Sequence, residues 1–377
     1  MRDVLPLAKP YFDTDEEREV RAVLRSGWVT QGPKVRELEV KLTGLLGVKH
    51  AVAVSSCTAA LHTALLALGV GKNDEVLVAD YTFPATAHAV VHCRAKAVFI
   101  DVDPKTYNMD PALIEKKISG RTKAIIPVHT FGQPARMDRI MKVARKHGLR
   151  VIEDAACALG ARYKNKFAGT IGDIGCFSLH ARKGITTGEG GVVVTNDERL
   201  ARSARELSNF GLTRSSWERE KGAKCSVCEF KTPGYNYKMS DITAAVGVAQ
   251  LRKLGRIIRK RQKLARRWDA ALRKIIGIEQ PFADERGTPI YQSYVALLDK
   301  GIDRDRVIQA LGRKGVQAGI GTYATHTLAV YGTKDVCPVS KDIFRRALAL
   351  PMYYSLKESQ IDHAAGILKK ILEGKRG

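Results

Sequence analysis

Residues 50 to 200 alternate between short β-rich runs and longer helical stretches, and this alternation constrains the fold more than any other feature of the 377-residue chain. The β-rich runs lie at 51–54, 75–78, 97–100, 124–128 and 150–153. The stretches with helical spacing of apolar residues lie at 58–68, 85–93, 111–118 and 137–147. Such alternation predicts βαβ crossovers, and therefore an α/β fold with a mostly parallel sheet covered by helices.

The remainder of the chain predicts a second, smaller unit. Two further strands are expected at 172–179 and 191–195, separated by a polar loop, and a long helix at 242–275. The elements expected after it are strands at 292–298 and 316–320 and helices at 304–314 and 359–372. We therefore expect a large domain over residues 1–255 and a smaller C-terminal α+β domain over 256–377.

Composition excludes several classes of protein. Hydrophobic residues make up 45% of the chain and charged residues 27%, which is enough for a sizeable core and argues against disorder. No apolar run approaches the roughly 20 residues that span a bilayer, and the first residues have no apolar signal core. The seven cysteines are an odd number, which favours a reducing compartment. These observations favour a cytoplasmic protein. The only closely spaced pair, Cys225 and Cys228, has no second pair to complete a zinc site.

The formal net charge of +24 raises the question of an anionic partner. Eleven Lys or Arg residues lie between Arg252 and Lys274, where apolar residues recur at three- and four-residue steps. This pattern predicts an amphipathic helix with a basic outer face. Such a face is either solvated or binds nucleic acid or another polyanion, and the pattern alone leaves both readings open.

Three segments carry residue types suited to chemistry. Residues 55–60 (Ser-Ser-Cys-Thr-Ala-Ala) follow a strand and open a helix, so they form either an anion site or an ordinary helix cap. Asp154 ends a strand, where a carboxylate can pair with a cation or a protonated ring nitrogen, or cap a helix. Lys183 lies in a loop between two strands, before a Gly-rich turn, and an amine held there can form a Schiff base with an aldehyde cofactor.

With these segments in view, the chain resembles the DegT/DnrJ/EryC1/StrS family of pyridoxal-phosphate-dependent sugar aminotransferases, which have fold type I. The matching stretches occur in family order from about residue 5 to about residue 365. They are 26–33, 55–61, 81–86, 132–134, 153–156, 177–191, 234–239 and 350–351.

The resemblance implies roles for particular residues. Lys183 corresponds to the lysine that forms the Schiff base with pyridoxal 5'-phosphate, and Asp154 to the carboxylate that pairs with its ring nitrogen. Phe83 corresponds to the aromatic residue that stacks on the ring. The positions that match the family's phosphate contacts are Thr58, Ala59, Ser178 and Asn236, the last reaching across from a neighbouring subunit and so implying a homodimer. The positions that match its substrate side are Trp28, Thr30 and His326, the last being a mobile histidine in the family.

The chain also departs from the family pattern. Cys57 replaces a glycine in the phosphate turn. Cys157 stands where glutamine or histidine often contacts the phenolic oxygen of the cofactor, and a thiol is a weaker donor. Lys238 replaces an arginine, so a bidentate anion contact would be lost.

Three functions remain open at this stage. The first is transfer of an amino group, from glutamate, to a keto sugar linked to a nucleoside diphosphate. The second keeps the cofactor but acts on a cyclitol or another ring ketone. Dehydratases of this fold carry histidine in place of the lysine, so Lys183 favours transamination. The third is a basic protein on the same fold that binds nucleic acid or an anionic surface, without membrane insertion.

Overall fold

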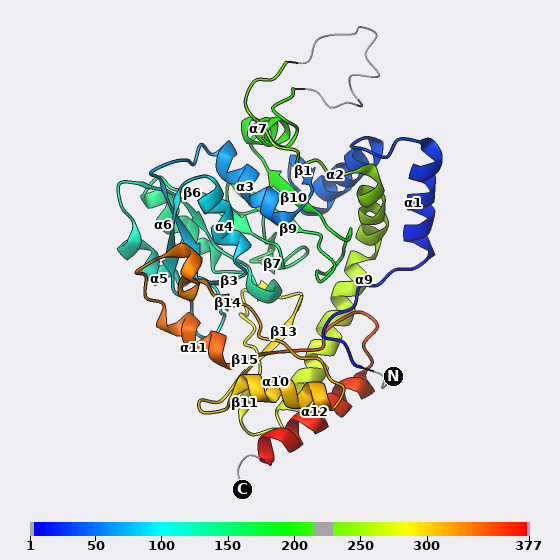
Figure 1. Cartoon of the computed structure of the whole chain (residues 1–377), viewed down its shortest axis with the longest axis vertical. Coiled ribbons are helices and arrows are strands. Elements are labelled where there is room, and N and C mark those ends of the chain that lie inside the picture. The colour runs from blue at the N-terminus through cyan, green and yellow to red at the C-terminus, as the bar shows by residue number, and fades with distance from the viewer. Residues whose placement is uncertain (1–3, 214–216, 218–228, 375–377) are drawn as a thin grey trace.

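The computed structural model describes residues 4–213, 217 and 229–374, and its centre is a seven-stranded sheet (Figure 1). The strands lie in the order β1-β10-β9-β6-β5-β2-β4. Only β10 runs antiparallel to its neighbours, which confirms the mostly parallel sheet. The bounds are β1 (His50–Val54), β2 (Glu75–Ala79), β4 (Lys96–Ile100), β5 (Thr122–Ile126), β6 (Arg150–Asp154), β9 (Ile174–Ser178) and β10 (Gly191–Thr195).

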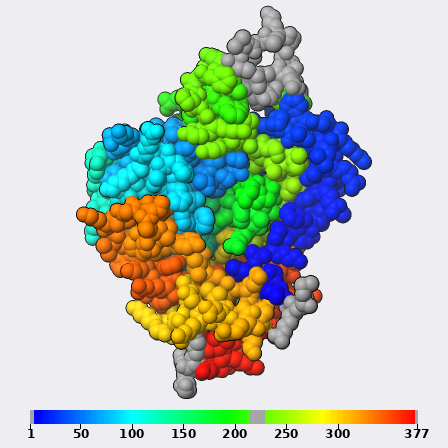
Figure 2. Space-filling model, in the orientation of Figure 1, coloured from blue at the N-terminus to red at the C-terminus, as the bar shows by residue number. Residues whose placement is uncertain are grey.

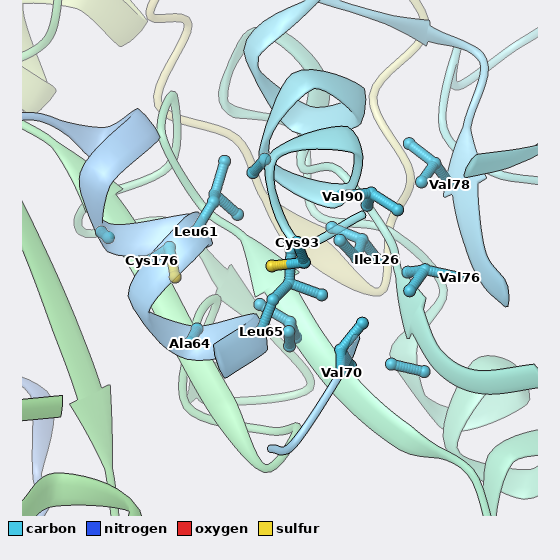
Figure 3. Packing of buried hydrophobic residues seen from close by; sticks show 14 of the residues in the cluster. Leu61, Ala64, Leu65, Val70, Val76, Val78, Val90, Cys93, Ile126 and Cys176 are labelled. Atoms are coloured by element: carbon cyan, nitrogen blue, oxygen red, sulfur yellow. The ribbon is translucent and has the colours of Figure 1, made fainter. Parts of the chain in front are cut away.

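Alternate side chains of each strand enter different cores, because successive residues of a strand point to opposite faces of the sheet. Val76 and Val78 of β2 pack in one core with Leu61 (Figure 3), whereas Leu77 packs in another with Ile140. The helices around the sheet are α2 (Pro33–Leu46), α3 (Cys57–Ala67), α4 (Ala85–His92), α5 (Pro111–Ile114), α6 (Met137–Lys146) and α7 (Glu198–Ser208). The helix expected at 111–118 is shorter than predicted, because α5 ends at Ile114 and a 3₁₀ turn at 115–117 follows it.

The long helix α9 (Asp241–Leu272) joins the large sheet to the smaller unit (Figure 1). Leu254 and Ile257 pack in the core against the large sheet, whereas Leu264 and Trp268 pack in the core of the smaller unit. The helix runs unbroken through residues 255 and 256, where the sequence places the domain division. That division stays a prediction.

The smaller unit contains the antiparallel sheet β11-β13-β15. Its elements are β11 (Ile278–Glu279), β13 (Tyr294–Leu298), β15 (Ala347–Leu350), α10 (Arg304–Arg313) and α12 (Glu358–Glu373). The strand expected at 316–320 is wrong, since Val316 and Gly319 form only isolated bridges, to Leu5 and Ala349. The backbone at Gly321 then turns with a φ of +72°, which favours glycine and ends extended pairing.

Short elements connect these two parts. β14 (Tyr323–Ala324) pairs with β3 (Tyr81–Thr82), and β3 directly follows β2 in the chain. This pairing and α11 (Pro338–Arg346), orange in Figure 2, place late residues against the large sheet. The other short elements are β7 (Arg162–Tyr163), β8 (Lys166–Phe167) and β12 (Gly287–Thr288), with 3₁₀ turns at 130–132, 325–327 and 329–331.

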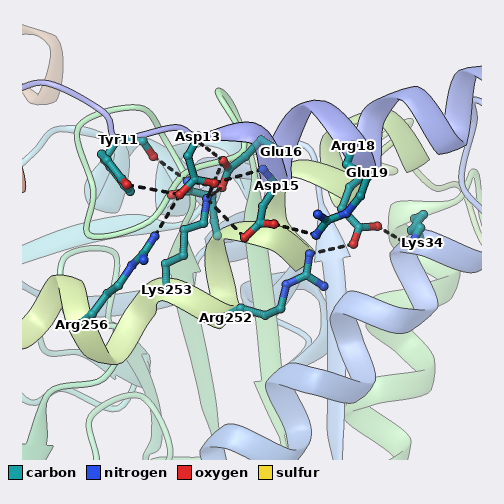
Figure 4. A network of polar contacts seen from close by, with 11 residues as sticks. Tyr11, Asp13, Asp15, Glu16, Arg18, Glu19, Lys34, Arg252, Lys253 and Arg256 are labelled. Carbon is teal, nitrogen blue, oxygen red and sulfur yellow. Dashed lines mark hydrogen bonds and ion pairs between the residues drawn. The ribbon is translucent and has the colours of Figure 1, made fainter.

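The basic face of α9 is paired with acidic residues of two other helices. Lys253 contacts Asp13 and Glu16, at the start of α1 (Thr14–Ser26), and Arg252 contacts Glu19 (Figure 4). Further along, Lys263 and Arg267 pair with Glu358 and Asp362 of α12. Much of this charge thus serves helix packing. Across the described part of the chain, no helix is both long and apolar enough to span a membrane.

Candidate active site

The candidate residues lie where the parallel strands end. Asp154 is the last residue of β6, Ser178 is the last of β9, and Ser55 follows β1. The carboxyl ends of parallel strands share one edge of a sheet, and in open α/β sheets this edge is where ligands bind. The topology therefore brings together residues that are far apart in the sequence.

Asp154 is a buried carboxylate with a fixed orientation. Its side chain is 4% exposed, and its oxygens accept hydrogen bonds from Thr86 Oγ1 at 2.7 Å and from the Ala156 N–H at 3.1 Å. Burial raises its pKa above the ordinary aspartate value, although these hydrogen bonds and the charge of Lys183 act in the opposite direction. A carboxylate in this setting gains stability when a cation approaches it. Thr86, in the first turn of α4, has no signal in the sequence pattern that links it to Asp154.

Lys183 lies on the loop after β9, and the charge of its amine acts on the Asp154 carboxylate. Its Nζ donates a hydrogen bond to Cys157 Sγ at 3.2 Å. Burial acts to lower its pKa, but Cys157, Cys57 and Asp154 more than offset this effect, and the pKa is raised. Lys183 and Asp154 thus influence each other electrostatically, and Cys157 lies within reach of the same amine.

The start of α3 forms a cradle for an anion. Ser56 is the N-cap, and its Oγ accepts the Ala59 N–H at 3.1 Å, so this N–H is already occupied. The N–H groups of Cys57 and Thr58 have no acceptor among the described residues. A Cβ on Gly191 would collide with the backbone of Ser56 and Cys57, so only glycine lets β10 lie this close. Free N–H groups at a helix start suit a phosphate.

Two further expected contacts lie around this cradle. Ser178 is 7% exposed, and its Oγ accepts the His180 N–H at 3.3 Å. The ring of Phe83 is 65% exposed and meets the ring of Tyr323 edge-on, with centroids 6.3 Å apart. Phe83 therefore offers a free aromatic face beside the strand ends.

His326 is hydrogen-bonded to Asp80 in this structure, and the mobility that the resemblance implies stays a prediction. Its Nδ1 bonds to Asp80 Oδ2 at 2.6 Å, and its backbone N–H donates to Asp80 Oδ1 at 2.6 Å. Thr325 and Ser340 also donate to the fully buried Asp80. Sequence reasoning missed Asp80, because 246 residues separate it from His326 and only the β3–β14 pairing brings them together.

Three expected residues have their hydrogen-bond partners elsewhere in this chain. Trp28 Nε1 donates to the Gln31 carbonyl at 3.2 Å, the Thr30 carbonyl accepts the Asp241 N–H at 3.1 Å, and Asn236 Oδ1 accepts Lys238 Nζ at 2.6 Å. Among the described residues, no hydrogen bond joins any of the three to Lys183 or Asp154. The pair Cys225 and Cys228 lies outside the described residues.

Together these groups can hold a flat cationic ring that also carries a phosphate and an amine-reactive carbonyl. The carboxylate of Asp154 suits a protonated ring nitrogen, and the helix start at Thr58 suits the phosphate. The amine of Lys183 suits the carbonyl, and Phe83 suits the ring face.

Comparison with known proteins agrees with this chemistry. The model of the DegT/DnrJ/EryC1/StrS aminotransferase family matches residues 10–369. The spore coat polysaccharide biosynthesis protein SpsC of Bacillus subtilis is 38% identical over 383 residues, covering 98% of this chain and 97% of SpsC.

Solved structures of similar proteins have the same fold. The putative sugar aminotransferase Spr1654 of Streptococcus pneumoniae, in its PMP-form, superposes with a TM-score of 0.92 at 28% identity, over 98% of this chain and 99% of that one. DesI, solved in the presence of its TDP-sugar product, superposes with a TM-score of 0.90 at 31% identity, over 100% of this chain and 95% of DesI.

Proposed function

The chain belongs to the DegT/DnrJ/EryC1/StrS aminotransferase family, and from this premise we propose that it transfers an amino group from glutamate to a keto sugar linked to a nucleoside diphosphate. Enzymes of this family use pyridoxal phosphate, so the chain is a pyridoxal-phosphate-dependent aminotransferase that acts on sugars. The nucleotide, the glutamate donor, the homodimer and the individual site roles are parts of the proposal. The proposal rests above all on the buried pair of Lys183 and Asp154.

The residues present fit this cofactor. The start of α3, where the N–H groups of Cys57 and Thr58 have no acceptor among the described residues, matches a phosphate, and Gly191 packs against its backbone too closely for a Cβ. The buried Asp154 has no cation partner at ion-pair distance among the described residues, and its raised pKa shows that its charge is poorly compensated. A protonated ring nitrogen would supply the missing positive charge. The amine of Lys183 would be the group that reacts with the carbonyl of the cofactor.

When bound, pyridoxal phosphate supplies an aldehyde that links to amines and a ring that withdraws electrons from the linked carbon. Asp154 would hold a proton on the ring nitrogen, which keeps the ring electron-poor. Thr86 would keep the carboxylate in place through its 2.7 Å hydrogen bond. The Nζ of Lys183, once displaced by the substrate amine, would take a proton from the donor carbon and return one to the acceptor carbon.

Three observations support a nucleotide-linked sugar as the acceptor. DesI, which shares the fold over 95% of its chain, is described with a TDP-sugar product, and SpsC is named for polysaccharide biosynthesis. A net charge of +24 would also speed the encounter with a diphosphate. None of the three distinguishes the sugar from a cyclitol in the pocket itself, so the acceptor is the part that most needs an experiment.

The test is a two-step acceptor assay. Purified enzyme with cofactor is first incubated with glutamate, and formation of 2-oxoglutarate is measured. The aminated enzyme is then offered a panel of nucleoside-diphosphate keto sugars, free keto sugars and keto cyclitols. We expect amination of nucleotide-linked sugars only. Turnover of a cyclitol or a free sugar at an equal or higher rate would overturn the nucleotide assignment while leaving the aminotransferase activity intact.

A further inference from the structure

Arg261 is a buried cation that the reaction described above does not use. It lies within α9, is 4% exposed, and burial lowers its pKa to about 10. Unlike Lys253 and Arg256 on the same helix, it forms no ion pair with any described residue. Its Nη1 donates instead to the backbone carbonyls of Gln292 at 2.8 Å, Tyr291 at 3.2 Å and Met352 at 3.4 Å.

A buried arginine without a counter-ion is an expensive feature of a fold. Desolvation of a charge costs several kcal/mol, and carbonyl dipoles compensate it only in part. The Nε of Arg261 has no hydrogen-bond acceptor among the described residues. A position that only had to fill this space would be served better by an apolar side chain. We therefore expect the guanidinium to have a role that depends on its charge and its hydrogen bonds, beyond filling space.

The remaining contact of Arg261 points to that role. Its Nη2 donates to the carbonyl of Lys183 at 3.4 Å. Next to it, Gln292 Nε2 donates to the carbonyl of Arg182 at 2.7 Å. Two consecutive carbonyls, those of residue 182 and of the candidate catalytic lysine, are thus held by two buried side chains.

We propose that Arg261 and Gln292 are positioning residues that fix the backbone on which the Lys183 amine is carried. The planar fork of a guanidinium donates to several carbonyls in one fixed geometry, whereas the ammonium of a lysine is a single rotating donor centre and a neutral side chain brings no charge. Tyr291 and Gln292 precede β13, and Met352 follows β15. One cation therefore ties the segments next to β13 and β15 to the lysine loop, so a displacement of these two strands would be passed to the backbone of Lys183.

This inference rests on the proposed role of Lys183 but not on the identity of the sugar. The experiment therefore follows only the linkage between the enzyme and pyridoxal phosphate. Cofactor-free wild type and the variants Arg261→Met, Arg261→Lys and Gln292→Leu are mixed with pyridoxal phosphate. The rate of linkage is measured by borohydride trapping, and the pH midpoint of the linkage by absorbance. Thermal unfolding of each variant is recorded in parallel.

Arg304 provides a matched control. It is 6% exposed and donates to the carbonyls of Phe344 at 2.8 Å and Ala347 at 3.2 Å, and it has no hydrogen bond to residue 182 or 183. Arg304→Met should lower the unfolding temperature but leave the linkage rate and the pH midpoint unchanged. A general loss of stability is thereby separated from a loss of positioning.

We expect Arg261→Met and Gln292→Leu to slow the linkage by about tenfold to a hundredfold, the cost typical of a small displacement of a reacting group, and to shift its pH midpoint. The linkage rate of Arg261→Lys should lie between the rates of Arg261→Met and wild type. Unchanged rate and midpoint in both Arg261→Met and Gln292→Leu would overturn the proposal, and if Arg261→Met does not fold, Gln292→Leu decides alone. Linkage that persists in Lys183→Ala would instead show that the role of Lys183 itself is wrong.

Discussion

At the scale of single residues, the candidate site contains groups that differ in how clearly the sequence marks them. Lys183 and Asp154 stand out in the sequence, because each lies in a short stretch that resembles the family, and their roles stay predictions. Thr86, Asp80 and Arg261 do not stand out, because their partners lie 68, 246 and 78 residues away and only the folded chain brings them together. A local sequence pattern can mark a residue as a candidate for a site, but it does not reveal which distant residue that residue contacts in the fold.

Asp154→Asn tests the carboxylate that is proposed to hold the ring proton. An amide is neutral, so it would not keep a proton on the ring nitrogen, and kcat should fall about a hundredfold or more, in line with the loss of an acid–base group. Steady-state kinetics and the absorbance of the bound cofactor provide the measurement. A kcat within threefold of wild type would contradict the assigned role.

Asp101→Asn is the matched control for this variant. Asp101 is 7% exposed and follows β4, but it accepts the N–H groups of Val339 and Ser340 at the start of α11. Its replacement should lower thermal stability through loss of this helix cap. The cofactor spectrum should remain that of the wild type.

At the scale of elements, the alternating pattern located the strands of the large sheet and helices α3, α4 and α6 to within a few residues. It did not find α7 or α11, nor α1 and α2, although Asp13 with Glu16 forms a capping box and Gly32 precedes Pro33. In α2 the apolar residues Val35, Leu38, Leu42 and Leu46 recur at helical spacing and pack in a core with Leu254 of α9, so a signal for this helix was present in the sequence. In contrast, α1 is mostly polar, and ion pairs with Lys253 hold it against α9.

The alternating pattern also missed β15, because the run Ala-Leu-Ala-Leu at 347–350 continues α11 without any break signal. Packing against β13 decides that this run is extended.

Lys253→Met tests the ion pairs that join α1 to α9 (Figure 4). Lys253 is 2% exposed and bonds to Glu16, which is 5% exposed, at 2.7 Å. Removal of the amine leaves the Glu16 carboxylate buried without its cation, so the free energy of unfolding should fall by about 3 kcal/mol. Arg252→Met, at the exposed pair with Glu19, should cost no more than about 1 kcal/mol. Chemical denaturation at neutral pH measures both values, and equal losses would contradict this account.

The same ion pairs imply that the stability of the protein depends on pH. Lys253 and the neighbouring N–H of Asp15 hold the pKa of Asp13 below its ordinary value. A carboxyl whose folded pKa is lowered contributes stability above its unfolded pKa and loses it as the pH falls through the folded value. The stability difference between wild type and Lys253→Met should therefore shrink as the pH falls below about 4. A difference that stays constant between pH 7 and pH 2 would contradict the role of Asp13.

At the scale of the whole molecule, the proposed role of Asn236 requires a second chain. Within one subunit Asn236 is bonded to Lys238, and among the described residues no hydrogen bond joins it to Lys183 or Asp154. The family resemblance assigns its side chain to the phosphate in the site of the neighbouring subunit. The proposed homodimer thus has a specific consequence, namely that each site draws residues from two chains.

Mixed dimers of Lys183→Ala and Asn236→Ala test this consequence. If Asn236 serves the neighbouring site, a mixed dimer has one site with both substitutions and one site with neither. After random exchange half of the dimers are mixed, so activity should recover to about a quarter of the wild-type value. Each variant alone, at the same total concentration, is the baseline. No recovery above the two baselines would show that Asn236 does not act across an interface.

The most direct test of the account concerns the amine of residue 183. Wild-type enzyme saturated with pyridoxal phosphate is reduced with borohydride, digested and analysed by peptide mass spectrometry. We expect one modified peptide, with the cofactor attached to Lys183, and no modified peptide in Lys183→Ala prepared in parallel. Attachment to another lysine, or an unmodified Lys183 in saturated enzyme, would contradict the proposed role of Lys183.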